Sequence, residues 1–178
     1  MSENIVLEAM KNRRSIRKFQ SALPPEDLIR QVMEAGSYAA SSMGRQSAVI
    51  VEVKDRAVRD RLSEVNRAIG GWDASFDPFY GAPVCLIVLA PKAEANRVYD
   101  GSLVMGNLML AAYAVGLASC WIHRAKETFE KPEWKEFLKK RGLKGEYEGI
   151  GICILGFAEG DHPAVPPRKP NRIFTDKA

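Results

Sequence analysis

The chain carries its most distinctive segment near its start, where residues 13–19 read Arg13-Arg14-Ser15-Ile16-Arg17-Lys18-Phe19. This basic, partly β-branched run favours an extended conformation, in which side chains alternate between two faces. Arg13, Ser15 and Arg17 then share one face and present two guanidinium groups with a hydroxyl between them. Because arginine forks fit phosphate oxygens and serine adds a neutral donor, we predict an anion site. A solvated basic turn and a nucleic-acid patch are the alternatives that the spacing leaves open.

The hydrophobic periodicity around this segment predicts a mixed α and β chain. Helices are expected at 3–12, from Pro24-Pro25 onward, and at 56–69, 98–115 and 126–141. Strands are expected at 48–53, 84–89, 117–122 and 150–157. The strand at 84–89 is apolar on both faces and is therefore predicted to be central. Helices come first in the chain and do not alternate strictly with strands, which favours an α+β fold.

Length and composition narrow the classes of protein to consider. The 178 residues predict one domain, residues 1–178, and a net charge of +4 does not by itself indicate a nucleic-acid partner. Three cysteines, an odd number, indicate free thiols in a reducing compartment, so we expect a cytoplasmic location. The uncharged stretch 101–122 is divided by Gly116, and we interpret it as protein interior and not as a membrane span.

Several familiar sequence motifs are incomplete or absent in this chain. The pair Gly149-x-Gly151 begins a dinucleotide fingerprint, but Ile154 stands at the third glycine position. The P-loop lysine and the hydrolase G-x-S-x-G motif are absent. With only His123 and His162, a histidine-based metal site is not expected. We therefore expect no metal and assign the chemistry to a bound cofactor.

Three further segments give the basic run its context. They are the small and polar run at 39–46, the Gly-Leu-Ala-Ser-Cys-Trp-Ile run at 116–122, and Leu155-Gly156-Phe157 followed by the Pro-rich residues 166–170. In this combination and order, the chain resembles the nitroreductase family of FMN-dependent oxidoreductases, from about residue 5 to 172. The resemblance implies a homodimer with a central, mostly antiparallel sheet flanked by helices. It also implies FMN at the subunit interface and a C-terminal tail that extends onto the partner subunit.

The resemblance also implies roles for the basic residues. Arg13 and Ser15 match the phosphate ligands, and Arg168 in the tail matches a further phosphate contact. Arg14 matches a backbone or ribityl contact. Arg17 matches the cation beside the N1/O2 edge of the flavin, where it would stabilise the reduced form. No side chain is expected to act as a catalytic acid or base, because the chemistry belongs to FMN.

Two other segments would contact the flavin ring. The resemblance implies that Ser41, Ser42 and Met43 lie against it from the partner subunit. It implies that Trp121, Ile122 and His123 lie beside it, with a backbone N–H of His123 facing N5. The chain departs from the family pattern above the ring, at Ala40, Gly44, Ser47-Ala48 and Gly106. These departures bear on substrate preference more than on FMN binding.

The function expected from the resemblance is a ping-pong reaction. NADH or NADPH would reduce FMN, and a nitroaromatic, quinone or similar small molecule would then take the electrons from the same pocket. The aromatic loop at 70–83 is expected to cover the substrate face, to form a hydrophobic lid or to make a dimer contact. A non-catalytic flavin or nucleotide binder and a small basic RNA-binding module are the alternatives. We expect neither nucleic acid nor membrane as a partner.

Some conspicuous residues also have a purely structural interpretation. Asn107, in an apolar helix, is expected to bond to backbone. Met105 and Met109 are expected to pack in the core or at an interface. Cys120 is expected to be a small buried hydrophobic residue and not a redox thiol.

Overall fold

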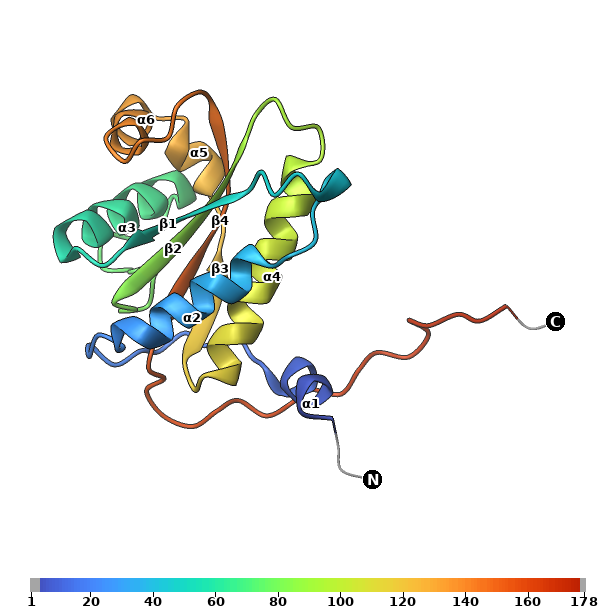
Figure 1. Ribbon diagram of the computed structural model, residues 1–178. Coiled ribbons are helices and arrows are strands. Elements are labelled where there is room, and N and C mark those ends of the chain that lie inside the picture. The colour runs from blue at the N-terminus through green and yellow to red at the C-terminus, as the bar shows by residue number, and fades with distance from the viewer. Residues whose placement is uncertain (1–3, 177–178) are drawn as a thin grey trace.

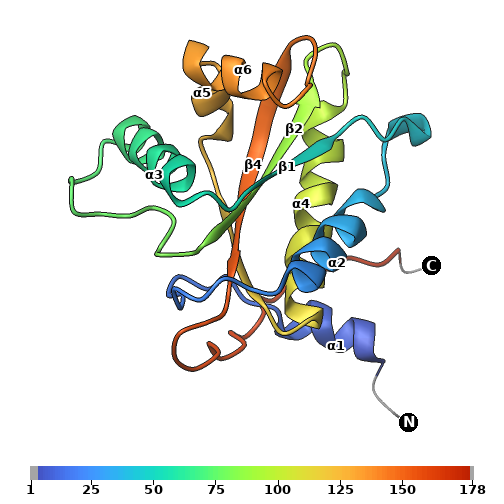
Figure 2. The same ribbon diagram turned by 60° about the vertical axis from the view of Figure 1, so that its left-hand side comes forward.

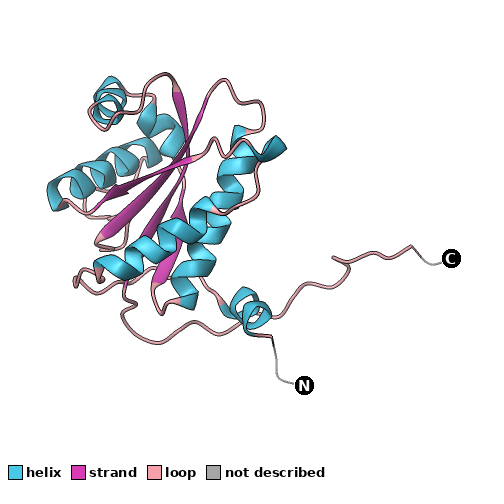
Figure 3. Cartoon of the chain, in the orientation of Figure 1, coloured by secondary structure: helices cyan, strands magenta, loops and turns pink. Residues whose placement is uncertain are grey.

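The computed structural model describes residues 4–176, which build a four-stranded antiparallel sheet between helices (Figures 1 and 3). The strand order is β1-β2-β4-β3. The strands are β1 (Val49–Val53), β2 (Val84–Pro91), β3 (Ala118–Ile122) and β4 (Tyr147–Gly156). This confirms the α+β prediction and the central place of the strand expected at 84–89.

Helices cover both faces of the sheet, as Figures 1 and 2 show. One face carries α2 (Glu26–Ser37) and α4 (Arg97–Ala114), and the other carries α3 (Arg56–Gly70), α5 (Ala125–Phe129) and α6 (Pro132–Lys139). Leu86 and Val88 pack with α2 and α4, whereas Ile87 and Leu89 pack into the cluster on the opposite face. Alternate residues of β2 thus enter two cores, which is why this strand is apolar throughout.

The first helix, α1 (Ile5–Asn12), lies beside the C-terminal end of α4 (Figure 1). It begins where the Asn4 side chain accepts hydrogen bonds from the N–H groups of Val6 and Leu7. The helix expected at 3–12 is therefore confirmed from residue 5 onward, and residue 3 lies outside the described residues.

The single helix expected at 126–141 is wrong. The structure has two helices there, α5 and α6, because Lys131 is extended, with φ −69° and ψ 139°, and Pro132 begins the second helix. Proline disfavours a helical conformation in the residue before it and has no N–H to continue the hydrogen-bond ladder. Apolar side chains on both sides of Pro132 conceal the break in the sequence.

Beyond β4, residues 159–176 form an exposed tail without helix or strand, which runs past α1 (Figure 1). No helix within residues 4–176 is long and apolar enough to cross a membrane.

Candidate cofactor site

The basic segment lies across the ends of two strands. Ile16 N–H donates to the carbonyl of Ser119 in β3, and Gln20 N–H donates to that of Phe157 just after β4, both at 3.0 Å. Ile16 and Phe19 are only 7% and 6% exposed. These two side chains anchor the segment, and the polar residues beside them are held at the margin of the sheet.

A small cleft of about 200 Å³ opens where this segment meets β3. Arg13 and Arg14 line it together with Ser119 and His162. Nη1 of Arg13 is buried and has no hydrogen-bond partner among the described residues. Because a buried unpaired cationic N–H is costly, the natural complement of this cleft is an anionic oxygen. The donor set fits a phosphate group.

The other basic residues of the segment have different surroundings. Arg14 donates to the carbonyl of Lys11 at 2.7 Å and also to that of Arg13, so its guanidinium holds the end of α1. Ser15 is half-buried and pairs with Ser119 in an isolated bridge, while Arg17 is exposed. Neither Ser15 nor Arg17 lines the Arg13 cleft.

The edge strand β3 leads from this cleft to the second group of expected residues. Ile122 is buried in the core, and Trp121 is half-buried with its indole Nε1 unpaired. His123 is exposed, and its ring centroid lies 5.9 Å from that of Trp121. Within residues 4–176, the N–H groups of His123 and Arg124 take part in none of the hydrogen bonds of turns, loops and caps. The backbone at this strand end can therefore donate to a ligand.

Two residues that the sequence did not single out shape this strand end. The side-chain amide of Asn66, on α3, donates to the His123 carbonyl at 2.7 Å. The Arg124 guanidinium lies over the ring of Trp72, with 4.2 Å between its carbon and the ring centroid. Asn66 lies on the inner, buried side of a charged surface helix, and that place on the helix was the only sequence signal that could have identified it. No sequence signal pointed to the Arg124–Trp72 contact.

The loop that carries Trp72 is fixed at its other end by Asp77. This carboxylate accepts hydrogen bonds from Arg59, from the Ser63 hydroxyl and from the N–H groups of Phe79 and Gly81. Burial opposes ionisation of Asp77, but these donors outweigh it and hold the pKa of the carboxyl below its ordinary value. The aromatic loop is therefore an ordered element, and the hydrogen bonds of Asp77 fix its C-terminal part.

The third expected group lies elsewhere in the chain. Ser42 begins a short 3₁₀ turn, η1 (Ser42–Gly44). The N–H of Ser42 donates to the Asp100 carboxylate, and its hydroxyl accepts a hydrogen bond from the Asn96 side chain, both at the start of α4. Ser41 accepts a hydrogen bond from Gln46 N–H, and Met43 is 84% exposed with φ 54°. The turn leads into β1, at the opposite edge of the sheet from β3. One chain therefore does not bring these residues to the Arg13 cleft.

Arg168 is also separate from the cleft. It is exposed in the tail and donates to the carbonyl of Pro166 at 3.2 Å. The same tail does reach the cleft through His162, whose ring packs against Tyr113 with centroids 5.6 Å apart. The structure thus brings Arg13 and the start of β3 together and leaves Arg168 at the surface of this chain.

The structural interpretations of the neighbouring residues are confirmed. Asn107 donates to the carbonyl of Ala35 at 3.2 Å, and Met105 and Cys120 are buried. Burial also raises the pKa of the Cys85 thiol to about 12, so this sulfur stays protonated at neutral pH.

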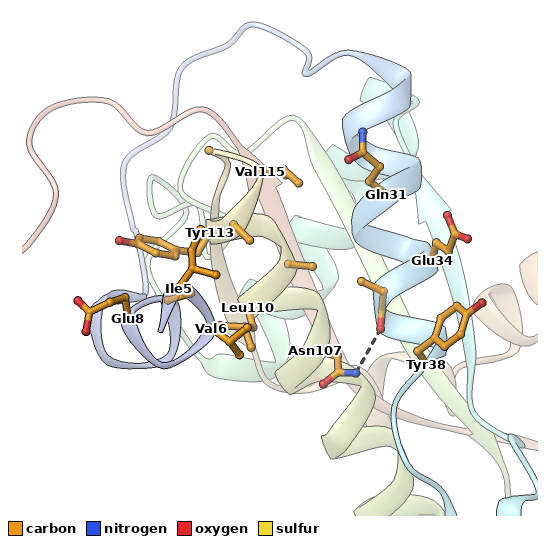
Figure 4. Close-up of a pocket in the computed structure, with 15 residues that line it drawn as sticks. Ile5, Val6, Glu8, Gln31, Glu34, Tyr38, Asn107, Leu110, Tyr113 and Val115 are labelled. Atoms are coloured by element: carbon orange, nitrogen blue, oxygen red, sulfur yellow. Dashed lines mark hydrogen bonds between the residues drawn. The ribbon is translucent and has the colours of Figure 1, made fainter. Parts of the chain in front are cut away.

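A large apolar groove of about 1000 Å³ lies between α1, α2 and α4 (Figure 4). Ile5 and Tyr38 border it and are 83% and 80% exposed. Figure 4 shows Ile5, Val6 and Leu110 at this surface, with Asn107 turned toward α2. The large apolar side chains exposed around this groove are of the kind found at interaction sites.

Comparison with known proteins adds independent findings. The sequence model of the nitroreductase family matches residues 10–157. A protein of Methanothermobacter thermautotrophicus named "Putative NADH dehydrogenase/NAD(P)H nitroreductase" is 32% identical over 130 residues, and the match covers 68% of this chain and 62% of that protein. This chain thus matches less than two thirds of that relative's length.

Solved structures agree on the fold. A nitroreductase with bound FMN from Bacteroides fragilis has a TM-score of 0.89 and 26% identity, and the match covers 98% of this chain and 100% of that chain. A nitroreductase with bound FMN from Desulfitobacterium hafniense has a TM-score of 0.85 and 24% identity, with the same coverage.

Proposed function

This chain belongs to the nitroreductase family, and we propose that it is an FMN-dependent oxidoreductase. It takes hydride from NADH or NADPH and passes electrons to a nitroaromatic, quinone or similar small molecule in a ping-pong reaction. The observation that carries the proposal is the buried, unpaired Nη1 of Arg13 in a cleft that opens at the start of β3. FMN, when bound, would supply a ring that accepts hydride and gives it up again.

The residues of this chain would hold and tune that cofactor. Arg13 donates to a phosphate oxygen, and Ser15 and Arg168 are the further phosphate ligands in the assembled protein. The exposed guanidinium of Arg17 offers a fixed positive charge for the edge of the ring that becomes anionic on reduction. Arg14 supports the site through the carbonyl of Arg13. The backbone of His123 offers its N–H at the end of β3.

We propose that the active form is a homodimer. The predicted ring contacts Ser41, Ser42 and Met43 lie on the far edge of the sheet from β3, so a second copy has to supply them. The apolar groove between α1, α2 and α4 gives that copy a surface to cover. The tail, whose Ile173 and Phe174 side chains are exposed, would extend over the partner and deliver Arg168. Three free, buried cysteines support a cytoplasmic location.

The test is the visible absorption spectrum of the purified protein before and after anaerobic addition of NADH or NADPH. We expect a bound-flavin spectrum that bleaches with at least one donor. Bound flavin that neither donor reduces would favour a non-catalytic flavin binder. A colourless protein that takes up no added FMN would refute the proposal.

A further inference from the structure

The turn that follows β3 is held from three sides. The His123 carbonyl accepts the hydrogen bond from Asn66 of α3. Arg124 has φ 73° and stacks on Trp72 of the aromatic loop. The carbonyl of Ala125 lies so close to Gly149 of β4 that a Cβ on Gly149 would collide with it. Three separate elements thus fix three consecutive residues of the turn.

The contribution of Asn66 is costly for the fold. Its side chain is 0% exposed, and its Oδ1 is buried without a hydrogen-bond partner among the described residues. A buried amide with one unpaired oxygen is no better for stability than an apolar side chain of similar shape. The one bond that this amide makes is the bond to His123. The position therefore serves the geometry of the turn more than the stability of the core.

That bond decides where the neighbouring N–H group points. The peptide between His123 and Arg124 is planar and trans, so its N–H points opposite to its C=O. Holding the His123 carbonyl toward α3 turns the Arg124 N–H away from α3. It also fixes ψ of His123, whose own N–H lies on the preceding peptide.

We propose that Asn66 is a positioning residue, which through its bond to the His123 carbonyl orients the backbone N–H of Arg124 toward the flavin ring, beside the N–H of His123. This inference rests on the proposed FMN function. Asn66 is fully buried and acts through the turn, by its bond to His123.

The test compares Asn66→Leu with wild type and with Thr128→Val as a matched control. Thr128 is also fully buried, lies in the neighbouring α5 and has an unpaired hydroxyl that contacts no part of the turn through a hydrogen bond. Asn66→Ala removes the same donor without adding volume and serves if the leucine variant does not fold. The measurements are the NMR backbone order parameters of the turn without FMN, FMN affinity, the spectrum of bound flavin and the rate of flavin reduction by the preferred donor.

We expect lower backbone order parameters at residues 123–125 and an altered spectrum of the bound flavin in the Asn66 variants. FMN affinity should stay within about threefold of wild type, because the phosphate is held elsewhere. Flavin reduction should slow by about 10- to 100-fold, the cost of displacing a reacting group by a fraction of an ångström to an ångström. Thr128→Val should behave as wild type in every measurement.

Two results would overturn the proposal. One is an Asn66→Leu protein with unchanged order parameters, spectrum and reduction rate. The other is a parallel loss of fold and FMN in both Asn66 variants, which would make Asn66 a structural residue. Failure of the proposed function is seen separately, as absence of FMN binding in the wild-type protein.

Discussion

The guanidinium carbon of Arg124 lies 4.2 Å from the centroid of the Trp72 ring and joins the turn after β3 to the aromatic loop. Trp72 continues into a ladder of edge-to-face rings, with centroids 5.1 Å apart to Phe76 and 5.8 Å from Phe76 to Tyr80. The loop thus contacts the predicted flavin-binding turn through Trp72 and is bonded to α3 through Asp77. A substitution at either of these two contacts should therefore alter the conformation of the whole loop.

The stack itself can be measured by a double-mutant cycle with Trp72→Leu and Arg124→Met. Because Trp72 remains partly exposed, we expect a coupling free energy of about 0.5–1 kcal/mol, near the lower end for cation–π pairs. Urea unfolding of the four proteins gives the value. Strictly additive effects would show that the two side chains meet without stabilising each other.

The Asp77 carboxylate is expected to be the main anchor of the loop. Asp77→Asn removes one of the two carboxylates that pair with the almost fully buried Arg59 guanidinium and leaves only Asp60, at 3.0 Å. We expect a loss of about 2–3 kcal/mol in the free energy of unfolding, less than for a fully buried pair because part of the Asp77 side chain is in solvent. Asp73→Asn, on the same loop but exposed, is the control. Equal unfolding midpoints for the two variants would contradict this role.

The same carboxylate predicts a pH dependence of stability. The pKa of Asp77 is lowered in the folded protein, because its donors outweigh the effect of burial. Its contribution is therefore fully present above the ordinary aspartate pKa of about 3.9 and is lost as the pH falls through the lower folded value. Thermal unfolding of wild type and Asp77→Asn between neutral and acidic pH should converge as the pH falls. A constant difference between them would be inconsistent with the pKa shift.

Much of the fold follows from local patterns. Strand β2 was recognisable because seven consecutive residues are buried on two faces, so no polar residue interrupts it. The break between α5 and α6 was missed because apolar side chains recur on both sides of Pro132, at Phe129, Trp134 and Leu138. The step of five positions from Phe129 to Trp134 does not fit the face of one helix, and it marks the break together with Pro132.

The candidate site also has one part that the sequence predicts and one part that it does not. The Arg13 segment was visible because its chemistry is local and its spacing is short. Asn66 was not, because its partner His123 is 57 positions away and no spacing rule connects a helix to a distant turn. The alternation also placed Ser15 and Arg17 on one face with Arg13, whereas Arg14 shares the cleft and they do not.

Two glycines make a matched pair for stability. A Cβ on Gly149 would lie 2.5 Å from the carbonyl carbon of Ala125, whereas one on Gly106 would meet nothing within 4 Å. Gly149→Ala should destabilise the protein by about 1–3 kcal/mol, because backbone has to move. Gly106→Ala, in the exposed part of α4, should stabilise it by about 0.5–1 kcal/mol through helix propensity. Chemical unfolding checks both, and effects of the same sign would refute the contrast.

The Arg13 cleft predicts the affinity for FMN. Arg13→Ala removes the proposed charge-assisted hydrogen bond to phosphate and should weaken FMN binding by about 10- to 100-fold. Adding Arg17→Ala should weaken it further and make flavin reduction thermodynamically harder. Arg56→Ala, an exposed arginine on α3, should change neither. Fluorescence titration with FMN gives the affinity, and an unchanged value for the double variant would leave the basic segment as a surface feature only.

The apolar groove predicts how the protein assembles. Ile5 and Tyr38 border it and are largely exposed in one chain, so Ile5→Glu and Tyr38→Glu should leave the fold of that chain intact. Either substitution would bury a carboxylate in the proposed dimer, and we expect dimer affinity to fall by about 100-fold or more. FMN affinity should fall with it, because we propose that Ser41–Met43 of the second copy contact the ring. Lys139→Glu on α6 is the control. Sedimentation at several concentrations checks the assembly, and a wild-type monomer that binds FMN tightly would exclude a shared site.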